Sequence, residues 1–105
     1  MNRFSVIYLL KQQYQHIYCA THAEAESIME RMLTQKGHTP IGIYDAKTEL
    51  FYWEPKRQDQ YNHARIEEQG QLGDQITTIA QTLRNQDEAW QHPANSISQL
   101  LSINP

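Results

Sequence analysis

Short apolar runs and one helical stripe occupy the first half of the chain, whereas the second half is mostly polar. Residues 3–10 read RFSVIYLL, a continuous run of β-branched and aromatic residues whose length favours a strand over a helix. A second strand-like run, YQHIYCA, follows at residues 14–20 after the polar connection KQQ. The two runs predict an antiparallel hairpin, although the connection lacks the Gly or Asn-Gly that would define its turn type.

The register of this hairpin is open, because side chains alternate along a strand and a slip of one residue exchanges its two faces. We consider the register in which Tyr8 lies opposite His16. It places an aliphatic set on the core face, namely Ile7, Leu9, Ile17 and Cys19. The reverse face then carries Phe4, Val6, Tyr8, Tyr14, His16 and Tyr18.

The clearest local pattern is a helix over residues 22–36. Thr21 followed by Glu24 forms a capping box, in which each side chain accepts a hydrogen bond from a main-chain amide at the helix start. Gly37 suits the left-handed position that often follows a helix. The apolar stripe expected to pack on a sheet consists of Ala25, Ile28, Met29, Met32 and Leu33.

The runs PIGIY (residues 40–44) and LFYWE (residues 50–54) predict a second hairpin. Asp45 begins the connection, and its carboxylate can accept a hydrogen bond from the turn backbone. A register with Tyr44 opposite Leu50 puts Ile41, Ile43, Phe51 and Trp53 on the core face. Tyr44 and Tyr52 then stand on the reverse face.

From Lys56 onward the chain is polar and charged, which indicates a domain edge or a linker. A helix is expected over residues 73–85, and a last short helix near residues 95–101. The fold class is therefore α+β: a four-stranded, mainly antiparallel sheet (ββαββ) with one helix packed on it and C-terminal helices. We assign residues 1–56 to this core and residues 57–105 to a helical extension that packs on the core or on a partner, within a single domain.

Composition narrows the function classes. The 105 residues carry a formal net charge of -3, so no basic field would hold a nucleic-acid backbone. Cys19 is the only cysteine, which rules out an intramolecular disulfide and a cysteine-based zinc site, and we expect it to be a buried, unreactive thiol. No segment has the pattern of a signal peptide or a membrane span, and we expect a cytoplasmic protein without membrane contact.

No catalytic, metal or phosphate motif is present. The five histidines show no metal-ligand spacing, and four scattered glycines cannot form a phosphate-binding loop. We therefore predict no catalytic residues, no metal and no cofactor. One alternative remains, a small-ligand binder or enzyme that uses a rim near the second hairpin, made of Asp45, Glu54, His16 and His63.

A second alternative is a nucleic-acid accessory protein, because aromatic and cationic residues alternate after the second hairpin. The residues of this possible ligand or nucleic-acid patch are Lys56, Arg57, Tyr61, His63 and Arg65. Acidic neighbours such as Glu67 and Glu68 neutralise the segment, so a solvated helix entry is favoured over nucleic-acid binding.

The leading hypothesis is a non-enzymatic binding or assembly module. If one helix covers one face of the sheet, the tyrosines leave a large apolar area on the other, and such areas mark interfaces. The partner would be a second copy, as a homodimer, or another protein. The possible interface residues on the sheet are Tyr8, Tyr18, Tyr44 and Tyr52, and those on the 73–85 helix are Leu72, Ile76, Ile79 and Leu83.

Overall fold

The computed structural model describes residues 2–90, of which residues 88–90 are described by their backbone alone. Four strands form one antiparallel sheet in the order β2-β1-β3-β4. The strands are β1 (Phe4–Leu10), β2 (Gln13–Cys19), β3 (His38–Asp45) and β4 (Leu50–Trp53), and the helices are α1 (His22–Met32), α2 (Pro55–His63) and α3 (Ile66–Trp90). The predicted α+β class with a ββαββ order is confirmed.

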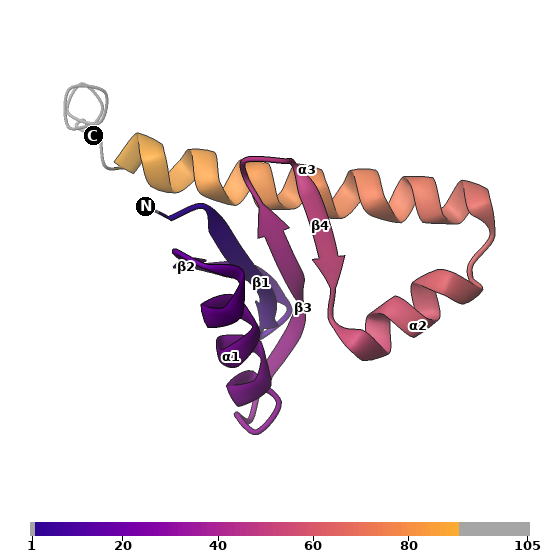
Figure 1. Cartoon of the computed structure of the whole chain (residues 1–105), viewed down its shortest axis with the longest axis horizontal. Coiled ribbons are helices and arrows are strands. Elements are labelled where there is room, and N and C mark those ends of the chain that lie inside the picture. The colour runs from indigo at the N-terminus through magenta and orange to yellow at the C-terminus, as the bar shows by residue number, and fades with distance from the viewer. Residues whose placement is uncertain (1, 91–105) are drawn as a thin grey trace.

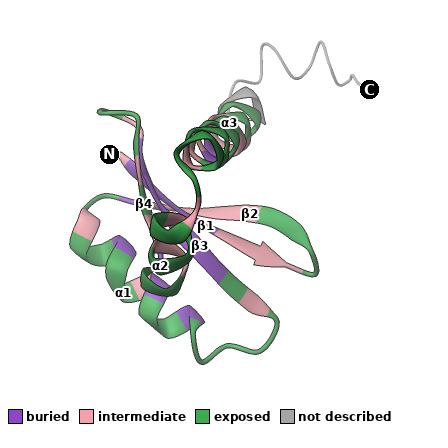
Figure 2. Ribbon diagram, turned by 90° about the vertical axis from the view of Figure 1, so that its right-hand side faces the viewer, coloured by how far each residue is buried: buried purple, intermediate pink, exposed green. Residues whose placement is uncertain are grey.

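The elements form three layers. Figure 2 shows the sheet between α1 on one side and α3 on the other, while Figure 1 shows α2 as an arm beyond the strands. The second face of the sheet is thus covered by the chain itself. The predicted helix near residues 95–101 lies outside the described residues.

The first hairpin turns through two residues rather than three. Lys11 and Gln12 both have positive φ, 52° and 64°, the pattern of the type I′ turn that suits a tight hairpin. Leu10 therefore pairs with Gln13, and Ile7 rather than Tyr8 lies opposite His16. The register with Tyr8 opposite His16 is wrong by one residue, because Gln13, the last residue of the connection KQQ, is the first residue of β2.

The second hairpin differs from its considered register in the same way. Tyr44 pairs with Phe51 and Asp45 with Leu50, because the four-residue loop extends to Glu49, whose φ is 61°. The predicted turn contact is present: the Lys47 amide donates to Asp45 Oδ1 over 2.9 Å.

A bulge in β3 adjusts its pairing with β1. The register shifts between Ile7, which faces Gly42, and Tyr8, which faces Pro40, so Ile41 is the additional residue. Gly42 is required here, since a Cβ atom at this position would approach the Phe51 ring to 2.6 Å and overlap the Tyr52 carbonyl oxygen.

Helix α1 begins as predicted and ends early. The Glu24 amide donates to Thr21 Oγ1 over 3.1 Å, and the Glu24 carboxylate accepts from the Ala20 amide over 2.8 Å. The helix stops at Met32, four residues before the expected end, and turns lead to Gly37, whose φ of 85° places it in the left-handed region.

Two apolar clusters fill the spaces between the layers. The α1-side cluster consists of Phe4, Val6, Cys19, Ala25, Met29, Met32 and Ile43. The α3-side cluster consists of Ile7, Ile41, Tyr44, Ile76 and Ala80, with Leu9, Phe51, Trp53, Ile79 and Leu83 packed around it.

The C-terminal half is more helical than expected. Helix α2, read as a linker from sequence, begins because Glu54 Oε1 accepts from the amides of Lys56 and Arg57 and because Pro55 suits the first helical position. Helix α3 begins at Ile66, seven residues before the expected start, and its first turns extend beyond the sheet (Figure 1).

Candidate functional site

The four tyrosines proposed as one interface lie on both faces of the sheet. Tyr8 packs against the α1-side cluster and stacks on His38, with ring centroids 5.5 Å apart, and the Tyr52 ring lies 5.0 Å from that of His22. Tyr44 is buried in the α3-side cluster. Tyr18 lies on that side too, with the Arg84 guanidinium 5.0 Å from its ring centre. The expected tyrosine-lined face is therefore absent, as a consequence of the one-residue difference in each register.

The apolar stripe of α3 is occupied mainly within the chain. Ile76 is buried, and Ile79 and Leu83 pack against the same cluster. Leu72 is 39% exposed, and Ile66 at the helix start is 85% exposed. The part of this stripe that could reach a partner is thus its N-terminal end.

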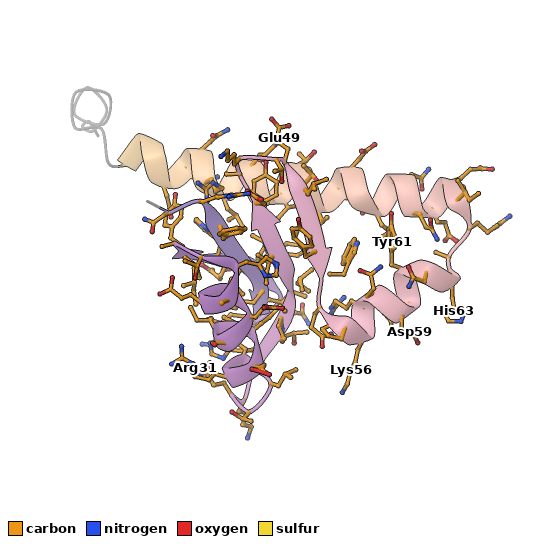
Figure 3. All side chains as sticks on the ribbon, viewed as in Figure 1. Arg31, Glu49, Lys56, Asp59, Tyr61 and His63 are labelled. Atoms are coloured by element: carbon orange, nitrogen blue, oxygen red, sulfur yellow. The ribbon has the colours of Figure 1, made fainter. Side chains whose placement is uncertain are left out.

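In the possible nucleic-acid patch, Tyr61 lies apart from Lys56 and His63 (Figure 3). Tyr61 stacks on Trp53, with centroids 5.3 Å apart and planes inclined by 29°. In Figure 3 it points from α2 to the side opposite Lys56 and His63. Stacking on Trp53 already occupies one face of the Tyr61 ring.

The four members of the proposed catalytic rim are separated. Asp45 forms a bidentate pair with Arg3, whose Nε and Nη2 donate over 2.8 and 2.7 Å, and this pairing holds the pKa of Asp45 far below its usual range. Glu54 caps α2, His63 is exposed near the end of that helix, and His16 faces α3. The structure does not bring these side chains to a common cleft.

A polar network that the sequence did not indicate connects β1, β2 and α3. His16 Nδ1 lies 3.2 Å from Ser5 Oγ, and His16 Nε2 lies 2.7 Å from Asp87 Oδ2. Arg84 donates to Ser5 Oγ and to the Asn2 carbonyl, each over 2.8 Å. These side chains are up to 82 residues apart in sequence, so no local spacing could have revealed the network.

This network contains a serine, a histidine and an aspartate, but its geometry does not suit nucleophilic catalysis. Ser5 has no exposed surface, so its hydroxyl cannot reach a substrate. Arg84 donates to the same oxygen, which lowers its ability to attack. We conclude that the network attaches the C-terminal half of α3 to the sheet.

The two edges of the sheet differ. β2 is seven residues long, contains no proline, lysine, arginine or carboxylate, and pairs with β1 without a bulge. β4 is four residues long and is followed at once by Glu54 and the proline that begins α2. Proteins normally protect edge strands by shortness, charge, proline or bulges, and β2 has none of these.

Cys19 is buried and has a free thiol, and burial raises its pKa, with Glu24 adding to the shift. The expectation of a buried thiol is confirmed. Among the side chains that the structure describes, those of residues 2–87, no group of three or more His, Cys, Asp or Glu could hold a metal ion. None of the described helices is long and apolar enough to span a bilayer.

Comparisons with protein-family models, curated proteins and solved structures found no match to this chain.

Proposed function

We propose that the protein is a small non-enzymatic assembly module whose copies associate through the outer edge of β2. The observation that supports this is the contrast between the two edges: β2 is long and contains no proline, lysine, arginine, carboxylate or bulge, and β4 is short and followed by proline. An unprotected edge pairs readily with a further strand, and the same strand from a second copy is the simplest complement. This replaces the tyrosine face as the associating surface.

The tight hairpin determines which main-chain groups of β2 are directed outward. Residues that flank a two-residue hairpin loop exchange hydrogen bonds, and the pattern then alternates along the strand. Gln13, Gln15 and Ile17 therefore direct their amides and carbonyls toward β1, and Tyr14 and His16 direct theirs away from it. Two copies paired in antiparallel fashion around His16 would extend the sheet from four strands to eight.

The association is expected to be weak. Edge pairing of two seven-residue strands buries less than the roughly 800 Å² per partner of a standard interface, so a dissociation constant in about the micromolar range is expected. The partly exposed ring of Tyr14 would add apolar contact. A cytoplasmic location stays a prediction, supported by the single, unpaired cysteine.

Sedimentation velocity over a range of concentrations tests the proposal. The wild-type chain should approach the mass of a dimer at high micromolar concentration. Tyr14→Pro should remain a monomer, because it removes an outward amide donor and places a ring in the path of the partner strand while the bonds to β1 stay intact.

Leu50→Lys at the opposite edge is the control: it changes an exposed side chain without removing a main-chain donor, and it should associate like the wild type. Circular dichroism establishes that each variant is folded. A wild-type chain that is a monomer at every concentration, or a Tyr14→Pro variant that still associates, would contradict the proposal.

A further inference from the structure

A groove of about 540 Å³ lies between α1 and the start of α2, at the end of the sheet opposite β2. Part of its lining is apolar, from Met29, Leu33 and Pro55. Leu33 is the first residue after α1, and its side chain is 57% exposed. The groove therefore offers apolar contact to a partner.

The rest of the lining contains three glutamates together with Ala23 and Ser27. Glu26, Glu30 and Glu54 all line the groove. Among the described residues, none of the three lies within 4.0 Å of a lysine or arginine nitrogen, and Glu26 has only the His22 ring nitrogen at 3.5 Å. Their negative charge is thus not neutralised by close cationic partners.

Glu54 differs from the two glutamates of α1 because it is 6% exposed. Its Oε1 accepts the two amides that begin α2, over 3.1 and 3.4 Å. The start of α2 places the partial positive charge of its helix dipole beside this carboxylate. A carboxylate fixed in the wall of an apolar groove attracts a cation more strongly than one surrounded by water, because screening is weaker there.

The spacing along α1 indicates the shape of the partner. Glu26 and Glu30 are four residues apart, so they lie on one side of α1, and the exposed Leu33 and Pro55 supply the apolar part of the lining. A second helix with apolar residues on one side and lysine or arginine beside them matches this combination. The 11 residues of α1 extend over about 16 Å, which corresponds to a segment of about three turns.

From the groove and its charge we infer that the protein binds a short, basic, amphipathic helical segment of a partner between α1 and the start of α2. Apolar side chains of that segment pack on the exposed Leu33 and Pro55, and its cations pair with Glu26 and Glu30. The surface is separate from the β2 edge, so the inference does not depend on self-association.

Fluorescence anisotropy with a labelled twelve-residue peptide of leucine and lysine, spaced so that the leucines share one helical face, tests this inference with the full chain. The wild-type protein should bind this peptide. It should bind a leucine and glutamate peptide of the same spacing, or a scrambled leucine and lysine peptide, at least about tenfold more weakly. Equal binding of all three peptides, or no binding of the first, would overturn the inference.

Two groove variants make the test specific. Glu26→Gln with Glu30→Gln should weaken binding roughly tenfold through the loss of two ion pairs, and Leu33→Ser should weaken it by a similar factor through the loss of apolar contact. The matched control is Glu49→Gln with Glu67→Gln, which changes the net charge equally; Glu49 lies at the other end of the molecule from the groove (Figure 3). A control variant that loses as much affinity as the groove variant would show general charge attraction and would refute a groove site.

Discussion

The two faces of the sheet are covered by helices that are held in different ways. On the α1 side, contact is almost wholly apolar, with Val6 and Ala25 among its fully buried residues. On the α3 side, an apolar cluster with fewer buried residues is accompanied by the network of Ser5, His16, Arg84 and Asp87. The Gln81 Nε2 amide also donates to the Tyr44 hydroxyl over 3.1 Å. Helix α1 is held by apolar burial, and helix α3 is held by apolar burial together with directional polar contacts.

Connectivity adds to this difference. Helix α1 is joined to β2 at its start and leads into β3 through a short turn, so it cannot leave the sheet without disturbing both strands. Helix α3 follows α2, which has no buried residues, and can separate while the four strands stay paired. We infer that the α1 side opens only with global unfolding and that the α3 side opens locally at lower free energy.

The largest effects should come from shortening one buried side chain on each face. Met32→Ala and Ile76→Ala each remove a side chain that is at most 3% exposed, and each should lower the free energy of unfolding by about 2–4 kcal/mol. Hydrogen exchange distinguishes the faces. Met32→Ala should accelerate exchange throughout the sheet and α1, and Ile76→Ala mainly in α3. Equal acceleration everywhere in both variants would contradict the inferred local opening.

The next effect concerns the ion pair beside the α1-side cluster. Asp45→Asn should destabilise the protein by about 1–3 kcal/mol at neutral pH, because the buried carboxylate accepts from Arg3 and the Lys47 amide. The pKa of Asp45 is lowered on folding, so this contribution is fully present above the unfolded pKa of about 3.9 and is lost as pH falls below it. Urea unfolding should show the gap between variant and wild type closing in acid. A constant gap would mean that the charge of Asp45 is not involved.

A smaller effect is expected for the polar network on the α3 side. Asp87→Asn keeps the shape of the side chain but removes the charge that faces His16, at a cost of about 0.5–1.5 kcal/mol. Amides of residues 76–87 should exchange faster, and those of α1 should not change. Asp74→Asn, an equal charge change at an exposed position of the same helix, is the control and should have no effect.

The last prediction concerns the rate at which a reagent labels the Cys19 thiol, and one of the two variants should not change it. The thiol is buried on the α1 side and its pKa is raised by burial, so a thiol reagent should label it slowly in the folded protein. Asp87→Asn should leave that rate unchanged, whereas Met32→Ala should increase it. Faster labelling in Asp87→Asn would show that the two faces open together.

The elements that the sequence predicts best are those determined by neighbours along the chain. The cap formed by Thr21 and Glu24 and the apolar stripe of α1 are local, and both are present. The registers were missed because Lys11 and Gln12 adopt positive φ without being glycine or asparagine, a choice that sequence preference disfavours. Helix α2 has a signal in the sequence, an acceptor at Glu54 before Pro55, but the run LFYWE that contains Glu54 is also typical of a strand.

The functional surfaces depend on contacts between distant segments, which a single sequence does not display. The strand order makes β2 an edge strand, and the sequence of β2 does not indicate this position. The groove joins α1 to Glu54 and Pro55, more than twenty residues later in the chain. The fold separates the four rim residues, and in the patch it directs Tyr61 away from Lys56 and His63 (Figure 3).

The strand order also has a consequence for how the chain reaches its native state. Each hairpin forms between segments that are close in sequence. The two central strands, β1 and β3, are far apart in sequence, so pairing Phe4 with Asp45 closes a long loop. Closing that loop costs chain entropy before the contacts compensate for it, which makes this step the expected bottleneck of folding. Helix α1 lies within this loop and shortens it when it forms. Its strong N-terminal cap should therefore accelerate the pairing of β1 with β3.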